Sequence, residues 1–397
     1  MKIIKIKNIN VFTFDLPLKK GFVLKSTFID SRKGALVEFE TEQGAKYYGE
    51  SSPLVHFHRE SYSECIKQIS EIKELLLGSP HGFYIEVPEE KKYDMEDFRT
   101  FFTRNFLERI KLHEPMKNPE NIFPSVRYCF EMIYLCIFIK NFDFIRHYNI
   151  SAESFIPLYR LISDIRQIDY GVLEEEIRSG IYDAVKIKIG RQAPECEISA
   201  IKKIINIIEK SNRKNMAIRL DSNMSLPANR LTEFFKKIDK EYIDFIEDPF
   251  DDTSFYREFY EKTGVGIAAD ESIKEFIDLK KMSFKKNSGE FIKALIIKPQ
   301  VIGGFIDSFR LLKMAESLKI RTVISNIFET SISVSALCIF IYLTGSRETS
   351  AGLDTLDSFL KDPGTVIIKT NNARISVCRA FENLFKADYS VLKKCSG

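Results

Sequence analysis

The chain has 397 residues, a length that favours two domains, one of them large. Its 59 basic and 56 acidic residues leave a formal net charge of +3, without the basic excess that is typical of a nucleic-acid-binding protein. With 44% hydrophobic and 29% charged residues the chain can bury a core, and no apolar run reaches the roughly 20 residues that a membrane-spanning helix needs.

The amino-terminal part of the chain combines strand and helix patterns. Alternating apolar and polar residues predict three strands, at residues 3–14, 35–40 and 46–49. Residues 60–140 have a helical pattern, with a charged and poorly periodic stretch at 86–120 that we interpret as an insertion. Residues 124–142 are strongly apolar and predict a buried helix.

Cysteine usage and the amino terminus favour the cytoplasm. The seven cysteines are far apart and never form a C-x-x-C pair, which argues against disulfides and thiolate zinc sites. The first residues lack the small-residue cleavage site of a signal peptide. We therefore expect a reducing compartment.

From about residue 157 the pattern changes to short apolar strands that alternate with amphipathic segments. We expect strands at residues 184–189, 217–220, 245–246, 266–269, 294–297 and 322–324. Segments such as 196–210 and 305–318 predict the intervening helices, and 332–343 predicts a buried helix. Strands that alternate with helices form parallel βαβ units. Six in succession favour a (β/α) barrel over an open doubly wound sheet, because no G-x-G-x-x-G follows the first strand of any unit.

These patterns predict an α/β protein in which a (β/α) barrel carries an α+β capping domain. We expect the cap, with its lid loops, over residues 1–150 and the barrel over 151–350. Residues 351–397 are expected to form the last barrel loop and a segment that returns to the cap.

Two lysines occupy alternate positions of the first predicted barrel strand, A-V-K-I-K-I-G. The period of two places Lys186 and Lys188 on one face and Val185 and Ile187 on the other. If the apolar face packs against the outer helices, both ammonium groups point into the barrel. Neighbouring lysines lower each other's pKa, which helps one of them act as a base. An edge strand with both lysines in solvent is the alternative.

Each of the next three strands ends in a carboxylate. These are Asp221 in L-D-S-N, Glu247 in I-E-D-P and Asp270 in A-D-E-S. Parallel strands deliver such residues to one rim of a barrel, where three carboxylates repel one another unless a cation neutralises them. An all-oxygen set suits Mg²⁺, with Mn²⁺ as an expected substitute. Taken singly, each acid is also a common N-cap for the helix that follows.

Lys298 follows the next strand, in A-L-I-I-K-P-Q. In a closed barrel this lysine lies roughly opposite Lys186 and Lys188, across the carboxylates. A base, a cation and a second ammonium group can remove a proton next to a substrate carboxylate and stabilise the resulting enediolate. A loop lysine in solvent is the alternative.

The ordered motifs K-x-K, D-x-N, E-D-P, A-D-E-S and I-K-P resemble the enolase superfamily, in its muconate-lactonising subgroup. The stretches GFVLKS, GESSPL, IKPQVIGG and AGLDTLD further resemble o-succinylbenzoate synthases. The resemblance implies a Mg²⁺-dependent hydro-lyase that dehydrates the small carboxylate 2-succinyl-6-hydroxy-2,4-cyclohexadiene-1-carboxylate in menaquinone biosynthesis. An N-acylamino acid racemase or dipeptide epimerase uses the same residues and is the alternative, followed by a metal-stabilised binding protein without catalysis.

The resemblance also implies a role for each matched position. The implied metal ligands are Asp221, Glu247 and Asp270. Lys188 would take the α-proton and return it to the departing hydroxyl, while Lys298 stabilises the enediolate and Lys186 assists Lys188. The positions matched to substrate contacts are Arg219, Asn223, Ser325 and Gly352, together with Lys25 and Ser26 in a mobile lid loop.

His56 and His58 have a spacing that suggests a metal site. No third ligand of matching type lies near them in the sequence, so we expect a loop role beneath the lid. The chain is longer than compact synthases, and the resemblance places the excess around residues 78–120.

Overall fold

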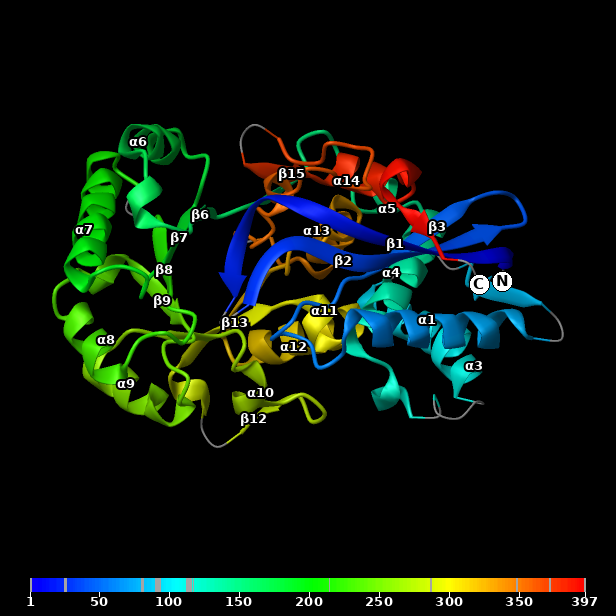
Figure 1. The fold of residues 1–397 in the computed structure, drawn as a ribbon, viewed down its shortest axis with the longest axis horizontal. Coiled ribbons are helices and arrows are strands. Elements are labelled where there is room, and N and C mark those ends of the chain that lie inside the picture. The colour runs from blue at the N-terminus through cyan, green and yellow to red at the C-terminus, as the bar shows by residue number, and fades with distance from the viewer. Residues whose placement is uncertain are drawn as a thin grey trace.

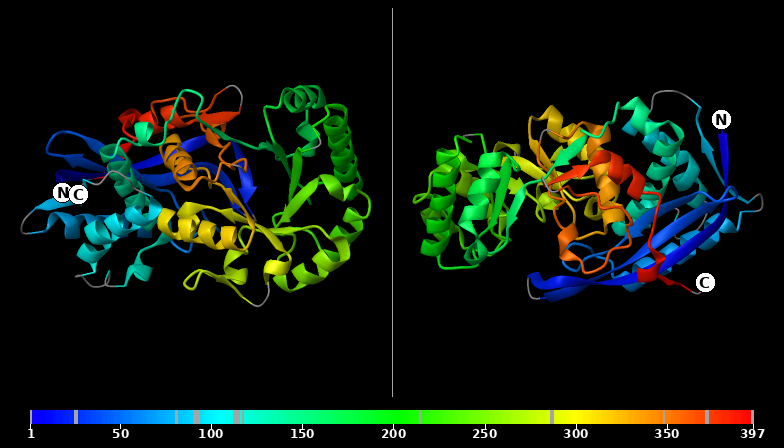
Figure 2. Two further views of the ribbon diagram at one scale, coloured as in Figure 1. Left: turned by 180° about the vertical axis from the view of Figure 1, so that it is seen from behind. Right: turned by 90° about the horizontal axis from the view of Figure 1, so that it is seen from above.

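The computed structural model describes most of the chain, and Figure 1 shows how its helices and strands are arranged. The described residues are 2–24, 27–79, 82–89, 94–111, 116, 118–213, 215–285, 288–347, 349–370 and 373–395. An antiparallel sheet with its helices lies towards one end of the molecule, and parallel strands covered by helices lie at the other. Both termini lie at the end away from helices α6 to α9 (Figure 2).

The antiparallel sheet contains, within the described residues, five strands in the order β16-β1-β2-β3, with β4 also paired to β1. The strands are β1 (Lys2–Leu24), β2 (Thr27–Thr41), β3 (Lys46–Ser51), β4 (Phe83–Val87) and β16 (Lys393–Lys394). The sequence predicted the first strands too short, because β1 and β2 stay paired beyond the core as a long hairpin, as far as Leu24 and Thr27. That hairpin reaches the barrel loops, where Phe22 stacks on Phe328 with ring centroids 4.5 Å apart.

Helix α4 is the core of the capping region. It spans Pro124–Asn141 and is buried on almost all sides, as its apolar sequence predicted. It packs so closely on β3 that a Cβ at Gly49 would stand 2.0 Å from the carbonyl oxygen of Cys129, so only glycine fits there. The remaining helices of this region are α1 (Tyr62–Leu77), α2 (Met95–Phe102), α3 (Glu108–Ile110) and α5 (Phe144–His147).

The segment interpreted as an insertion is packed onto this core. Phe102 and Phe106 stack with ring centroids 4.9 Å apart, and Phe106 stacks on Phe130 of α4 at 4.8 Å. This stretch therefore has an apolar face that is hard to recognise in the sequence among its many charged residues. It extends the core of the cap.

The parallel sheet has, within the described residues, seven strands in the order β14-β13-β10-β9-β8-β7-β6. They are β6 (Arg160–Ile162), β7 (Ala184–Lys188), β8 (Ala217–Asp221), β9 (Ile243–Glu247), β10 (Ile267–Ala269), β13 (Ile292–Ile297) and β14 (Arg321–Ile324). Residues Ala351 and Gly352 join the two edges of the sheet, through parallel bridges to Leu158 and Ser325. The predicted barrel is thus confirmed, while β6 was missed because three residues carry too little pattern.

Helices cover the outside of this curved sheet (Figure 1). They include α6 (Tyr170–Ser179), α7 (Pro194–Lys210), α8 (Ala228–Phe235), α9 (Tyr256–Thr263), α10 (Ile273–Phe276), α11 (Pro299–Ile302), α12 (Phe305–Ser317), α13 (Ser331–Thr344) and α14 (Val377–Asn383). Short strands β5 (Phe155–Pro157) and β15 (Arg374–Ser376) pair with each other, as do β11 (Ile277–Asp278) and β12 (Ser283–Phe284). In the part of the chain that the structure describes, no helix is long and apolar enough to cross a membrane. The expected domain limits at residues 150 and 350 stay a prediction.

Buried charges join the cap to the barrel. Arg32 of β2 donates hydrogen bonds to the carbonyl oxygens of Ser52 at 2.6 Å, Pro53 at 3.3 Å and Phe328 at 3.2 Å. Nearby, the buried Glu50 of β3 accepts a hydrogen bond from the hydroxyl of Thr330, in the loop after β14, at 2.5 Å. Because these groups are shielded from water, their pairing fixes the β1–β2 hairpin and β3 against the loops at the carboxyl end of the barrel.

Replacing Arg32 by methionine is expected to lower the free energy of unfolding by about 3 kcal/mol or more. It removes the donor of three backbone carbonyl groups, and the cation that faces the buried carboxylates Glu50 and Glu329. Urea unfolding of Arg32→Met measures this loss. The matched control is Lys33→Met, whose exposed ion pair with Asp15 at 3.6 Å is worth at most about 1 kcal/mol. Equal losses in the two variants would contradict the assignment.

A pH dependence follows from Glu329 in the same junction. Burial, together with the charge of Glu50, raises the pKa of Glu329 to about 8. Between pH 5 and 8 the unfolded chain therefore loses a proton that the folded chain retains, so stability falls as pH rises. The free energy of unfolding of Glu329→Gln, relative to that of the wild type, is expected to rise by more than about 1.4 kcal/mol from pH 5 to pH 8. Unfolding at several pH values measures the gain, which the exposed control Glu316→Gln should not show.

Candidate active site

Charged side chains gather at the carboxyl ends of the barrel strands. They are Lys186, Lys188, Asp221, Glu247, Asp270 and Lys298. Lys188 is the strand partner of Asp221, and Asp221 is the partner of Glu247, so these three residues lie at one level of the sheet. Asp270 directly follows β10 and Lys298 directly follows β13. Five strands thus bring to one rim the residues that the sequence placed there.

Ion pairs connect these lysines and carboxylates. Lys186 Nζ lies 2.9 Å from a carboxylate oxygen of Asp221 and also contacts Glu247. Lys188 Nζ lies 3.5 Å from the same oxygen of Asp221. Lys298 Nζ donates to Asp270 at 2.6 Å. Three ammonium groups therefore face three carboxylates in a largely buried space.

The lysines differ in how firmly they hold their protons. Burial lowers the pKa of Lys188, the charge of Asp221 only partly offsets this, and the positive charge of Lys186 lowers the pKa further. Burial also acts on Lys186, but the charges of Asp221 and Glu247 outweigh it and hold that pKa well above its usual value. The expectation that the pair lower each other's pKa is therefore correct for Lys188 and wrong for Lys186, which has two carboxylate partners.

The carboxylates also differ from one another. Burial raises the pKa of Asp221, but Lys186 and Lys188 outweigh it, so this pKa falls well below the usual range. Burial raises the pKa of Glu247, and the negative charges of Asp221 and Asp270 raise it further. The carboxylates thus repel one another across the strands, as the sequence predicted.

The donor chemistry of this cluster fits a hard divalent cation. All three acids supply oxygen ligands from adjacent strands, and burial together with the charges of Asp221 and Asp270 raises the pKa of Glu247. Among the described residues, however, no three His, Cys, Asp or Glu side chains converge closely enough to hold a metal ion as they stand. The ammonium groups of Lys186 and Lys298 contact the carboxylate oxygens instead, so these ion pairs would have to open for an ion to enter.

Asp248, the second acid of the E-D-P motif, was missed by the sequence reasoning. Its buried carboxylate accepts hydrogen bonds from the backbone N–H groups of Glu271 at 2.6 Å, Ser272 at 3.2 Å and Asp270 at 3.4 Å. The hydroxyl of Ser272 also donates to it. Asp248 therefore holds the loop that carries Asp270. Two acids in succession at a strand end were the available signal.

The cap contributes an aromatic ring to the cluster. The ammonium group of Lys298 lies 4.1 Å from the ring centroid of Phe57, the residue between His56 and His58 in the sequence. His58 Nδ1 accepts from the backbone N–H of Leu54 at 3.1 Å, and its Nε2 lies 3.2 Å from the carbonyl oxygen of Gln300. These contacts give His58 a structural part in its loop, in line with the loop role expected for it.

The residues matched to substrate contacts are only partly brought together. Asn223 accepts a hydrogen bond from Lys188 Nζ at 2.8 Å and so belongs to the cluster. Ser325 and Gly352 are neighbours, since the Ser325 hydroxyl donates to the Gly352 carbonyl oxygen at 3.1 Å. Arg219 points away from the lysines and pairs with Asp244 at 3.2 Å. Lys25 and Ser26 lie outside the described residues.

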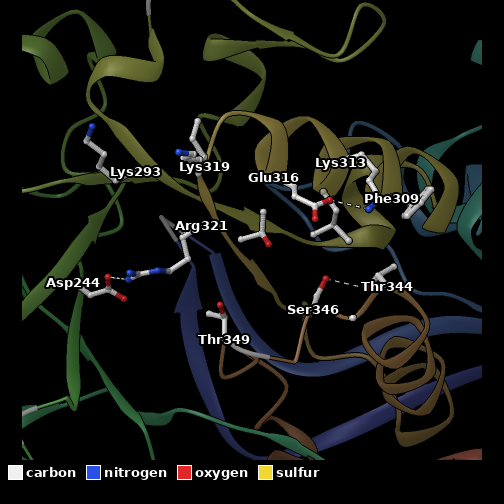
Figure 3. Close-up of a pocket in the computed structure, with 14 residues that line it drawn as sticks. Asp244, Lys293, Phe309, Lys313, Glu316, Lys319, Arg321, Thr344, Ser346 and Thr349 are labelled. Carbon is white, nitrogen blue, oxygen red and sulfur yellow. Dashed lines mark hydrogen bonds and ion pairs between the residues drawn. The ribbon is translucent and has the colours of Figure 1, made fainter. Parts of the chain in front are cut away.

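A pocket of about 570 Å³ opens at the other end of the barrel (Figure 3). Its lining includes Asp244 of β9, Lys293 of β13 and Arg321 of β14, all near the amino ends of their strands. Asp244 and Arg321 form an ion pair there. None of the six clustered residues lines this pocket, so its volume does not mark the candidate active site.

Comparisons with known proteins identify the family of the chain. Residues 172–377 match the family described as enolase C-terminal domain-like, and residues 6–88 match the one described as MenC, N-terminal domain. Over 359 residues the chain is 23% identical to the o-succinylbenzoate synthase of Pasteurella multocida strain Pm70, an alignment that covers 89% of this chain and 90% of the relative.

Solved structures share the fold. An enolase-superfamily member from Roseovarius nubinhibens ISM aligns with a TM-score of 0.71 at 16% identity, over 100% of this chain and 99% of that one. The dipeptide epimerase of Enterococcus faecalis V583, complexed with Mg and the dipeptide L-Leu-L-Tyr, aligns with a TM-score of 0.68 at 17% identity, over 98% and 99% of the two chains.

The loop of residues 270–272 is expected to become more mobile when the Asp248 carboxylate is replaced by a weaker hydrogen-bond acceptor. Asp248→Asn presents an amide to three backbone donors, so amide hydrogen exchange at 270–272 should rise and Mg²⁺ affinity should fall about 10-fold or more. Mass-spectrometric exchange and calorimetric titration with MgCl₂ measure the two effects. Asp251→Asn, at an exposed neighbouring position, is the control. Unchanged exchange and affinity in Asp248→Asn would refute the positioning role.

Proposed function

The chain belongs to the enolase superfamily, in its muconate-lactonising subgroup, and from this premise we propose that it is an o-succinylbenzoate synthase of menaquinone biosynthesis. The observation that carries the proposal is the position of Lys188, a partly buried lysine of lowered pKa that lies 3.5 Å from Asp221, while Lys298 contacts Asp270 on the other side of the carboxylate cluster. The similarity to a synthase over about nine-tenths of both chains supports the choice of reaction.

Lys188 acts as the base. Because burial lowers its pKa, a larger fraction of this amine is neutral and able to take the α-proton of 2-succinyl-6-hydroxy-2,4-cyclohexadiene-1-carboxylate. The C–H electron pair then forms the new ring double bond as the C–O bond to the hydroxyl breaks. Lys188 returns its proton to that hydroxyl, which leaves as water on the same face. The product, o-succinylbenzoate, is aromatic, so elimination runs downhill.

Lys186 and Lys298 act as fixed positive charges. Burial lowers the pKa of Lys298, but Asp270 outweighs it and raises the pKa above its usual value. Both lysines therefore stay protonated and stabilise the negative charge that develops on the substrate carboxylate as the proton leaves. Mg²⁺ held by Asp221, Glu247 and Asp270 would supply further positive charge at the same carboxylate. Asn223 orients the Lys188 amine through its 2.8 Å hydrogen bond.

Racemisation or epimerisation is the second candidate, because Lys188 and Lys298 flank the carboxylates from two different strands. Such a reaction needs both lysines to exchange protons with the substrate. The 2.6 Å contact with Asp270 retains the proton on Lys298, whereas the Lys188 amine has a lowered pKa. This asymmetry favours elimination with one base over proton transfer between two.

Purified protein with Mg²⁺ is expected to convert the cyclohexadiene carboxylate to o-succinylbenzoate, followed by the change in ultraviolet absorbance. Lys188→Ala should lose at least about 10³-fold in kcat, since it removes the base, while its affinity for Mg²⁺ stays within a few-fold. Lys293→Ala, a lysine at the opposite end of the barrel, is the control and should keep wild-type turnover.

Two outcomes would overturn these assignments. If the protein does not turn over the cyclohexadiene carboxylate but exchanges the α-protons of N-succinylamino acids in deuterated water, the synthase assignment is wrong and the racemase assignment takes its place. Normal turnover by Lys188→Ala would remove the base assignment and leave the choice of reaction intact.

A further inference from the structure

The rim of the barrel is divided by charge. In sheet order, β8, β9 and β10 carry the carboxylates, and β7 and β13 carry lysines on either side of them. The remaining arc runs through β14, the Ala351–Gly352 segment and β6. Its residues next to the cluster are neutral: Ser325, Gly352 and Tyr159. A substrate whose ring carboxylate faces the cations would direct its side arm towards this neutral arc.

Tyr159 lies within the barrel, just before β6. Its ring centroid is 6.0 Å from Lys186 Nζ and 5.6 Å from the guanidinium carbon of Arg219. Arg219 is held in turn by Asp244 at 3.2 Å and by the carbonyl oxygen of Ser350 at 3.1 Å. Two cations from neighbouring strands therefore lie against the ring of Tyr159.

The hydroxyl of Tyr159 lies beside Gly352. A Cβ at Gly352 would stand 2.5 Å from the Tyr159 hydroxyl and 2.6 Å from the hydroxyl of Ser325, so no larger residue fits between the two groups. Ser325 uses its hydroxyl on the Gly352 carbonyl oxygen. The Tyr159 hydroxyl has no hydrogen-bond partner among the residues that the structure describes, although the side chain is only 7% exposed.

A hydroxyl that no protein group engages can donate to a bound molecule, and such a hydrogen bond adds affinity. Burial raises the pKa of Tyr159, and the hydroxyl therefore keeps its proton at neutral pH. The positive charges of Lys186 and Lys298 act on the same region and favour an electron-rich oxygen as acceptor.

We propose that Tyr159 is a substrate-binding residue whose hydroxyl donates a hydrogen bond to an oxygen of the substrate's side arm, next to Ser325, while its ring forms the floor of the site. The assignment rests on the proposed function and adds a source of specificity to it. Cyclic carboxylates with an oxygen-bearing side arm are preferred over those whose side arm is a hydrocarbon.

The test compares two ligands by calorimetry in the presence of Mg²⁺. One is o-succinylbenzoate, and the other is 2-butylbenzoate, whose side arm has the same number of carbons without the oxygens. Tyr159→Phe is expected to lower the affinity for o-succinylbenzoate about 10-fold and to leave the affinity for 2-butylbenzoate within 2-fold of the wild-type value, because only the hydroxyl is lost. In turnover, KM should rise about 10-fold with kcat nearly unchanged.

Two further variants sharpen the test. Tyr260→Phe is the matched control, since its ring also lies against a lysine, 5.3 Å from Lys293 Nζ, but at the amino ends of the strands. It should bind both ligands as the wild type does. Gly352→Ala places a carbon 2.5 Å from the Tyr159 hydroxyl, which must then move, and it should reproduce the selective loss of o-succinylbenzoate affinity.

The outcomes separate this assignment from the function on which it rests. If the wild type binds o-succinylbenzoate and Tyr159→Phe binds it equally well, the role of Tyr159 is overturned and the synthase stands. A loss of both ligands to the same extent would also overturn the role, because it points to a displaced ring. If the wild type does not bind o-succinylbenzoate, the proposed function falls, and the assignment falls with it.

Discussion

Repulsion among three carboxylates on neighbouring strands is the constraint on which the rest of this site depends. Strands in a sheet lie about 4.8 Å apart, so Asp221, Glu247 and Asp270 are held close together whatever their charge. Three lysines offset this repulsion in the structure, two from β7 and one from the end of β13. The same arrangement suits a divalent cation, and it explains why the cluster needs positive charge on both sides.

The scaffold around the cluster serves to keep these charges in place and away from water. Asp248 binds the loop that carries Asp270 through three backbone N–H groups, and Phe57 of the cap covers Lys298. Arg32 fixes the long hairpin of the cap to the loop after β14. Burial lowers the local polarity, which strengthens each ion pair and lowers the pKa of Lys188. Through Phe57 and Arg32, the cap therefore helps to hold the site together.

Differences in partner number divide the work among the lysines. Lys186 contacts two carboxylates and Lys298 contacts one at short range, so both stay charged. Lys188 is 3.5 Å from a carboxylate that Lys186 already contacts, and its amine is the one whose pKa is lowered. Across the barrel, the residues near Gly352 carry no charge. Charge thus determines orientation as well as reactivity.

The sequence by itself determined the order of these residues and the face they occupy. A period of two put Lys186 and Lys188 inside the barrel, and one carboxylate per strand predicted the cluster at its rim. It could not determine how deep a side chain reaches. Arg219 is the strand partner of Lys186, yet Arg219 turns down to Asp244 while Lys186 turns up to Asp221 and Glu247. Likewise, only the tertiary structure placed Tyr159 and Asp248, because long or loop-bound groups choose partners that are distant in sequence.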